Sequence, residues 1–289
     1  MHLIWYAVPF FLLSMLIEWR LTAHHHSEAG YTAPDTAASL AMGLGNRLFG
    51  LLPKAGVFML WVFLYEHRLF DLPTDAWWVW ALCFVAEDHC YYWFHRAHHE
   101  VRFLWAAHVN HHSSTHYNLS TALRQSWTTP FTGPWFWLPL PLLGFHPTMI
   151  AVAMTVSLAY QFWIHTEWIG SLGPFGWVFN TPSHHRVHHG RNPEYLDRNH
   201  AGILIVWDRL YGTFEPERAE VDYGLTTNLA THNPVVIAFH EWAAMLRDSL
   251  TATTWRGRIG VWLMPPGWRE DGTGKTSAVL RKEAEDATR

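Results

Sequence analysis

The sequence contains few charged residues and few cysteines for its length. Asp, Glu, Lys and Arg make up 15% of its 289 residues, whereas roughly 25% is usual in a soluble domain. Its two cysteines, Cys83 and Cys90, lie in one stretch that changes from apolar to polar, which argues against a disulfide framework and a cysteine-ligated iron–sulfur cluster. The formal net charge is −4 and no basic stripe occurs outside the histidine-rich region, so nucleic acid is not an expected partner.

Several catalytic motifs are also missing. His99-Glu100 and His240-Glu241 begin the zinc-protease pattern HExxH, but neither continues to the second histidine. No Walker loop occurs, and GLGNRLFG from Gly43 does not complete a dinucleotide-binding fingerprint. Because no flavin, nicotinamide or iron–sulfur motif is present, oxygenase chemistry in this chain would need electrons from an external donor.

Long uncharged runs are the main positive feature. Leu3–Ile17 is apolar and uncharged, Leu48–Tyr65 is apolar but interrupted by Pro53 and Lys54, and a third apolar run starts at Trp77. Residues 125–166 contain no charged side chain. That last run is about twice the ~20 residues of one span and breaks at 144–147, which predicts a membrane hairpin. We expect Leu3–Ile17 to be an anchor helix rather than a signal peptide. The fold class is therefore predicted to be all-α, a polytopic integral membrane protein with about four transmembrane helices.

Tryptophans and arginines indicate how such a protein would lie in the membrane. The 19 tryptophans and 10 tyrosines are typical of segment ends at a membrane interface. The loop from Glu66 to Thr74 contains only Arg68, whereas many arginines lie on the histidine-rich side. These are Arg20, Arg47, Arg96, Arg102, Arg124, Arg186, Arg191, Arg198 and Arg209. The positive-inside rule then predicts a cytoplasmic histidine-rich cap and an N-terminus on the opposite side.

Three parts of the chain are expected. Residues 1–217 are predicted to form a single membrane-embedded domain, with histidine boxes at 95–112 and 184–189. Residues 218–267 are predicted to be an amphipathic helical extension, and residues 268–289 a flexible charged tail.

Histidines are concentrated in three short motifs, HRAHH, HVNHH and HHRVHH. Positions i, i+3 and i+4 share one face of a helix, and eight histidines follow that spacing. They are His95, His99, His108, His111, His112, His185, His188 and His189, with His165 and His184 as further candidates. Neutral imidazole is the commonest metal ligand in proteins, so this set predicts two first-row metal ions with positions left for dioxygen or substrate.

A single histidine in an apolar helix is more often a hydrogen-bonded core or surface residue than a ligand. A cluster differs, because crowded imidazoles repel on protonation and cost desolvation near a membrane. Asp88 and Tyr92 precede His95 and His99 on one helical stripe, so Asp88 is a candidate to orient a ligand imidazole through its second N–H. The alternative is a polar residue where the helix leaves the membrane.

Other polar residues are candidates to support the ligands. His98, His116 and His200 lie near the boxes, and each is a candidate either to bind metal or to support a ligand. Asn118 and Arg124, and later Asp208 and Arg209, are predicted to brace the histidine loops by hydrogen bonds or ion pairs. A lipid headgroup site is the alternative interpretation of these residues.

At HRAHH, HVNHHSS and HHRVHHGRN the sequence resembles the fatty acid hydroxylase/sterol desaturase superfamily, over roughly residues 80–215. The stretches HHSSTHYNLSTALRQSW, DRNHAGILIVWDRLYGTFEPE and PPGW are most similar to its ether-lipid-cleaving branch. The resemblance implies a non-haem di-iron centre, a membrane lipid substrate, dioxygen as oxidant and, for this branch, a tetrahydropterin reductant. It places the ligands on the same eight histidines, with His165 and His184 as further matches. The sequence departs from the pattern at His98, where a small or apolar residue is expected, and at His200, which is usually Tyr.

We therefore expect a membrane di-iron monooxygenase that hydroxylates a lipid C–H bond. A hydroxyl placed next to an ether oxygen gives a hemiacetal that separates into aldehyde and glycerol. The alternative within the superfamily is a sterol or fatty acid desaturase or hydroxylase. A metal transporter would carry its ligands near the bilayer midplane, and a b-type haem carrier would need isolated axial histidines. Zinc is expected to compete for these imidazoles in a purified sample.

Overall fold

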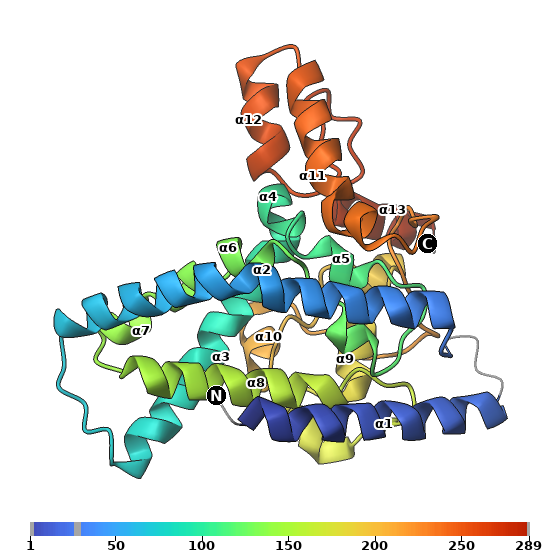
Figure 1. The fold of residues 1–289 in the computed structure, drawn as a ribbon. Helices are drawn as coiled ribbons and strands as arrows, with labels where there is room; N and C mark the ends of the chain where they lie inside the picture. The colour runs from blue at the N-terminus through green and yellow to red at the C-terminus, as the bar shows by residue number, and fades with distance from the viewer. Residues whose placement is uncertain (1–2, 26–29, 288–289) are drawn as a thin grey trace.

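Four long helices frame the computed structural model, which describes residues 3–25 and 30–287 (Figure 1). They are α1 (Leu3–His25), α2 (Ala33–Glu66), α3 (Trp77–Glu100) and α8 (Pro147–Trp163). The described residues contain no β-strand, only two isolated bridges. The predicted all-α class is confirmed.

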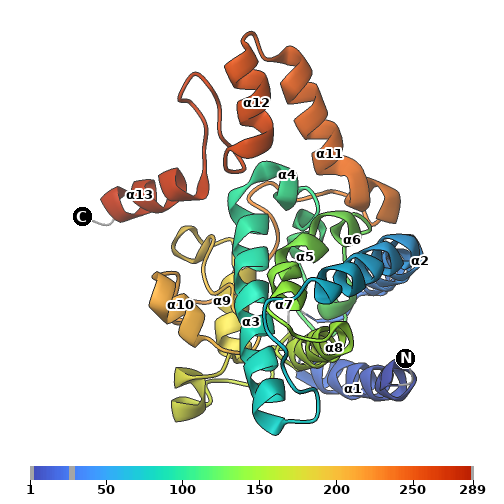
Figure 2. The ribbon, with the colours of Figure 1, turned by 90° about the vertical axis from the view of Figure 1, so that its left-hand side faces the viewer.

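Shorter helices connect and cover the frame. In chain order they are α4 (Arg102–Trp105), α5 (Val109–His112), η1 (Thr121–Leu123), α6 (Thr129–Thr132), η2 (Pro134–Trp137), α7 (Pro139–Leu142), η3 (Gly173–Trp177), α9 (Pro182–His189), η4 (Pro193–Tyr195), α10 (Val206–Tyr211), α11 (Pro234–Thr251), α12 (Trp255–Leu263) and α13 (Ser277–Ala287). The pair α11 and α12 projects from the body beside α4 (Figure 2). The amphipathic extension predicted for 218–267 thus contains this helical hairpin.

The tail predicted to be flexible, 268–289, contains the helix α13. This helix packs on η4, and the Arg281 guanidinium donates to the carbonyl of Leu196 at 2.6 Å. Residues 288–289 lie outside the described part of the chain.

The predicted membrane hairpin forms only in its second half, which is α8. The first half is divided into α6, η2 and α7, each of four residues. Prolines 130, 134, 139 and 141 explain the division, because proline lacks the backbone N–H that a continuous helix needs. Among the described residues, one helix, α2, is both long and apolar enough to cross a bilayer. Of the four spans expected, one is thus identified by length and hydropathy.

The core between α3 and α8 is made of small and medium apolar side chains. Val79 and Cys83 on α3 pack with Ile150 and Ala153 on α8, and all four are fully buried. This contact holds the end of α8 close to the last turns of α3, where the histidines begin.

A close approach at Gly45 brings α2 against the loop that follows α5. A Cβ atom at Gly45 would clash with the indole ring of Trp127, whose Nε1 donates to the carbonyl of Met42 at 3.2 Å. Glycine is required here by space rather than by backbone conformation.

Arg124 links α2 to the segment that carries α5. Its side chain is almost wholly buried and its Nη1 lies 3.1 Å from Asp35 of α2. Its Nε donates to the carbonyl of Asn110 and to the hydroxyl of Ser113, at 3.1 and 3.0 Å. One guanidinium therefore connects a long helix to the segment that carries three histidines.

Replacing Arg124 with glutamine is expected to lower the free energy of unfolding by about 3–5 kcal/mol, because Asp35 would remain buried without its cation. The matched control is Arg191→Gln, which breaks a partly exposed ion pair with Asp222 and should cost about 1 kcal/mol or less. Reversible unfolding in mixed detergent measures both. Equal losses in the two variants would contradict the role given to Arg124.

Candidate metal centre

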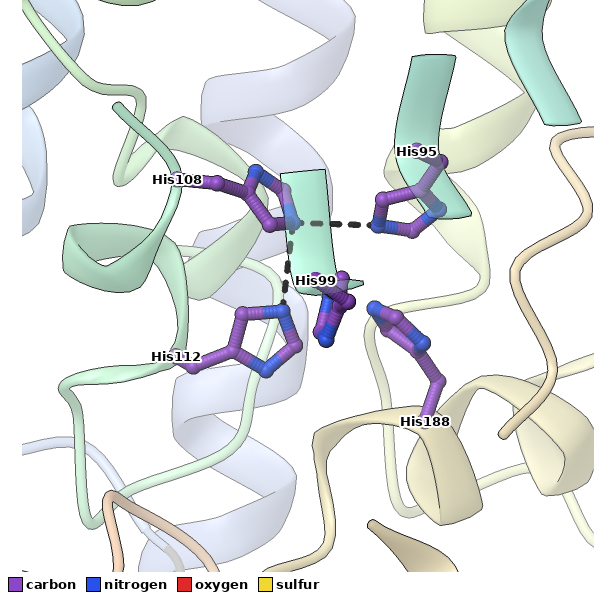
Figure 3. A group of neighbouring side chains, drawn as sticks. All are labelled: His95, His99, His108, His112 and His188. Carbon is purple, nitrogen blue, oxygen red and sulfur yellow. Dashed lines mark hydrogen bonds between the residues drawn. The ribbon is translucent and has the colours of Figure 1, made fainter. Parts of the chain in front are cut away.

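Nine buried histidines converge in two neighbouring groups. Site A consists of His95, His99, His108, His112 and His188. Site B consists of His111, His165, His185 and His189. Within each group the ligand nitrogens lie within 4.8 Å of one another. Figure 3 shows the five imidazoles of site A pointing toward a common centre from three separate parts of the chain.

Helical spacing explains how the motifs divide between the sites. Each i, i+4 pair serves one site: His95 with His99 on α3, and His108 with His112 around α5, belong to site A. On α9, the pair His185 and His189 belongs to site B.

The remaining histidine of each HxxHH motif points to the other site. His111 of α5 enters site B and His188 of α9 enters site A. Adjacent residues on a helix differ by about 100° in direction, so each HH doublet reaches both sites. The rings of His112 and His189 stack at 4.4 Å between centroids, so the two sites lie side by side.

Backbone carbonyls set the orientation of several imidazoles. A carbonyl oxygen only accepts, so each Nδ1 that contacts one carries the proton, and the lone pair is left on Nε2. The pairs are His95 with the carbonyl of His200 at 2.8 Å, His188 with that of Arg198 at 2.9 Å and His165 with that of Gln161 at 2.7 Å. Nδ1 of His99 instead faces the carboxylate of Asp197 at 3.3 Å.

The resulting set of lone pairs fits metal ions. Nε2 of His95 lies 3.0 Å from Nε2 of His108, and Nε2 of His165 lies 3.0 Å from that of His185. Other ring nitrogens are buried without any hydrogen-bond partner, and these include Nε2 of His99, His188 and His189. Buried acceptors without a donor are costly, and a cation in each site would satisfy them together. A donor set made only of imidazoles suits iron, zinc, copper or nickel rather than magnesium or calcium.

Burial keeps these histidines neutral. Desolvation is the largest cause that lowers the pKa of His111, His112, His185, His188 and His189 well below the usual value, and neighbouring imidazoles lower it further. Metal ligation requires the neutral form of histidine, so the fold holds these side chains in the state that binds.

Asp88 does not contact an imidazole, which corrects the sequence-based expectation. Its carboxylate accepts from the backbone N–H groups of Ile203 and Leu204, at 2.7 and 2.9 Å, and from the indole of Trp207 at 2.9 Å. The side chain is drawn to these unpaired backbone donors of a buried loop. Asp88 therefore fixes the loop rather than a ligand.

Asp208 holds the other end of the same loop. It accepts from the backbone N–H groups of His200 and Ala201, at 2.7 and 2.8 Å, and from the hydroxyl of Thr213 at 2.6 Å. The carbonyl of His200 in turn orients His95. This bracing matches the interpretation made for Asp208 from the sequence.

Tyr92 and Asn118 also act on the surroundings of the sites. The Tyr92 hydroxyl shares a hydrogen bond with Thr213 at 2.9 Å and accepts from Arg96 at 3.2 Å. The Asn118 side-chain oxygen accepts from the backbone N–H and the hydroxyl of Ser120, at 3.0 and 2.6 Å. Both hold chain segments in place and neither contacts a histidine of sites A or B through these bonds.

His98 lies outside both sites, because each of its nitrogens already has a partner. Nδ1 donates to the carbonyl of Phe94 at 2.7 Å, and Nε2 contacts the hydroxyl of Thr132 at 3.0 Å. His200 is fully buried with no hydrogen-bond partner at either ring nitrogen, and its ring centroid lies 5.1 Å from that of His99.

His184 is the one predicted ligand that the structure does not bring into either site. Successive residues of a helix point about 100° apart around its axis. On α9 the directions of His185, His188 and His189 therefore fall within an arc of about 100°, and His184 points about 40° outside that arc. Its ring packs edge-on against Phe214 at 5.4 Å.

The supporting contacts of residues 197–200 were missed by the sequence-based assignment. Asp197 and Asn199 have positive φ values of 53° and 56°, a conformation that Asp and Asn tolerate better than most residues. The DRN sequence carries this weak signal. Nothing in a sequence marks a backbone carbonyl as the partner of an imidazole.

Comparisons with known proteins agree with the site. The fatty acid hydroxylase family model matches residues 80–213. The chain is 41% identical over 283 residues to an alkylglycerol monooxygenase of Homo sapiens, covering 98% of this chain and 63% of that protein. It is 42% identical over 267 residues to that of Danio rerio, covering 91% and 59%. It therefore spans less than two thirds of the length of these two relatives.

A shorter relative is covered more fully. The chain is 30% identical over 193 residues to a cholesterol 25-hydroxylase-like protein of Danio rerio, covering 62% of this chain and 72% of that protein. No solved structure matches the chain.

Metal-free protein is expected to lose stability as the pH falls below about 6.5, the usual histidine pKa. Folded-state pKa values of the site histidines lie below that value, so the unfolded chain takes up protons that the folded chain does not. Each such imidazole lowers the free energy of unfolding by up to about 1.4 kcal/mol per pH unit. Denaturation of chelator-treated protein between pH 8 and 5 measures this slope, and a flat profile would contradict neutral burial.

A pair of adjacent variants tests which face of α9 binds metal. His185→Gln is expected to reduce bound metal by up to one ion per chain, because site B keeps only three imidazoles. His184→Gln should leave the metal content unchanged, since His184 lies outside both sites. Elemental analysis of both proteins after loading with ferrous iron gives the answer. Equal loss in both would place His184 among the ligands.

Proposed function

This chain belongs to the fatty acid hydroxylase family, and we propose that it is a membrane-bound, non-haem di-iron monooxygenase acting on alkyl ether lipids. The observation that carries the proposal is the pair of adjacent all-histidine sites in a chain 41% identical to an alkylglycerol monooxygenase. We assign nine of the ten predicted metal ligands to the two ions, and the tenth, His184, lies in neither site.

Two bound ferrous ions would supply the reductive activation of dioxygen and the oxidation of a C–H bond. The chain contributes five imidazoles to one ion and four to the other. Carbonyl contacts at Nδ1 of His95, His165 and His188 fix the tautomer, so that Nε2 faces inward. Burial of all nine rings excludes water from the ligands.

The overall reaction balances with an external reductant. One oxygen atom of dioxygen enters the lipid carbon next to the ether oxygen, and the other leaves as water after uptake of two electrons and two protons. The hydroxylated carbon is a hemiacetal, which separates into an aldehyde and the glycerol part. We propose that the electrons come from an external donor, a tetrahydropterin.

We further propose that the protein is multi-pass, with about four spans and the histidine boxes on the cytoplasmic side. Large apolar side chains on α2 support this arrangement, since Leu52 and Met59 are 84% and 73% exposed. A surface of this kind is stable in lipid rather than in water. The arginine-rich character of the histidine side supports the cytoplasmic assignment.

A sterol hydroxylase is the second candidate, favoured by the cholesterol 25-hydroxylase-like relative. A metal transporter is less well supported, because all nine site histidines are buried and gathered in two adjacent groups.

Purified, iron-loaded protein with a tetrahydropterin should convert an alkylglycerol to the corresponding fatty aldehyde under ¹⁸O-labelled dioxygen. The aldehyde carbonyl should carry the label when it is reduced at once to the alcohol. His111→Ala should lower the rate at least about 100-fold, since it removes a ligand of site B. The matched control, His67→Ala, changes an exposed histidine and should retain activity.

Cholesterol in place of the alkylglycerol separates the two candidates. A hydroxylated sterol with no aldehyde from the ether would replace the first candidate with the second. No labelled product from either lipid, in protein shown to hold two irons, would contradict an oxygenase.

A further inference from the structure

A pocket of about 270 Å³ lies against the N-terminal turn of α9. Its lining includes Ser171, Gly176, Trp177, Ser183, His184 and Arg209. No acidic residue lines it. The histidine that does not reach the metals, His184, therefore faces a separate cavity.

The positive charge of Arg209 is not neutralised by any carboxylate in the described chain. Its guanidinium lies 3.7 Å from the ring centroid of Phe214, and its Nη2 donates to the carbonyl of Gly176 at 3.3 Å. Both contacts hold the exposed guanidinium in place while leaving its charge available to an anion bound in the pocket.

His184 is a second polar side chain in the wall of the pocket. The residue is 9% exposed, and its Nδ1 is buried without a hydrogen-bond partner. Its ring reaches the pocket because residue 176 is glycine; a Cβ there would lie 3.1 Å from Cε1 of the imidazole. An imidazole in the wall of the pocket can donate a ring N–H to an anion.

The first turn of α9 adds to the positive potential. Ser183 follows Pro182 at the start of the helix, where backbone N–H groups point outward and favour anions. No hydrogen bond of the Ser183 hydroxyl is found within the described residues. A guanidinium, a hydroxyl, an imidazole and a helix N-terminus are suited to a phosphate group.

The rim of the pocket indicates where that phosphate comes from. Trp177 and Leu172 line it and are 68% and 38% exposed, and Phe175 and Val178 beside them are 42% and 44% exposed. Exposed tryptophan and aliphatic side chains are typical of a membrane interface. A phosphate held beside such a rim would carry acyl chains.

We propose that this pocket binds the phosphate group of a glycerophospholipid. The pocket and the two metal sites share helix α9, which carries Ser183 and His184 as well as His185, His188 and His189. The proposal concerns binding alone and stands whether or not the chain is an oxygenase.

Calorimetric titration of the full, metal-loaded chain with dihexanoyl phosphatidic acid tests it, with dihexanoylglycerol as the matched lipid that lacks phosphate. Two variants are compared with the parent protein. Arg209→Gln removes the cation, and Ser183→Asp keeps Arg209 but places a negative charge in the pocket while remaining favourable at a helix N-terminus. Both variants should bind the phosphatidic acid at least tenfold more weakly and bind dihexanoylglycerol as the parent does.

Unchanged metal content and melting temperature show that the variants are folded. Phosphatidic acid binding that is absent from the parent protein, or equal in all three proteins, would overturn the proposal. Inorganic phosphate is the third probe. If it binds the parent as tightly as the phosphatidic acid and shows the same dependence on Arg209, the pocket holds free phosphate and the lipid assignment is overturned.

Discussion

The rest of this structure depends on one constraint: nine imidazoles are buried close together. Each neutral ring has one N–H and one lone pair, and a buried ring must place both. Where an oxygen outside the cluster takes the N–H, as the His200 carbonyl does for His95, the lone pair turns inward. The cluster is therefore ordered from the outside, by oxygen atoms that surround it, before any ion is bound.

Those oxygen atoms must themselves be held in place, and buried Asp and Arg side chains do this. Asp88 on α3 and Asp208 on α10 bind the backbone of residues 200–204 from opposite ends. Arg124 performs the same task for the α5 segment by joining it to Asp35 of α2. Each group pairs with backbone or with an opposite charge, so burial leaves few of them unsatisfied. The long apolar helices provide a rigid frame for these contacts, because α3 carries both a packed core and two histidines.

The spacing of the histidines along the sequence predicted which of them gather on common helical faces. Spacings of three and four residues identified α3, α5 and α9 and the three groups of histidines that they present. Those spacings did not show that the doublets at 111–112 and 188–189 divide between two sites, because the division depends on where the neighbouring helices lie. His184 satisfied the same spacing but lies beyond the arc that faces the metals.

Asp88 was expected to contact an imidazole because carboxylates often do, yet the unpaired N–H groups of Ile203 and Leu204 lie within its reach. Segment 129–142 was equally difficult, since its composition is apolar while its prolines prevent one continuous helix.

The small helix α9 shows what this arrangement implies for function. Its eight residues present three imidazoles to the metal sites on one side, and Ser183 and His184 to a positively charged pocket on another. Arg186 fixes the helix between them, through Glu217 at 2.7 Å and the carbonyls of Thr166 and Ile169 at 3.0 and 2.8 Å. A helix restrained in this way cannot rotate to favour one side without disturbing the other. The eight residues of α9 therefore supply both candidate metal ligands and part of the pocket wall.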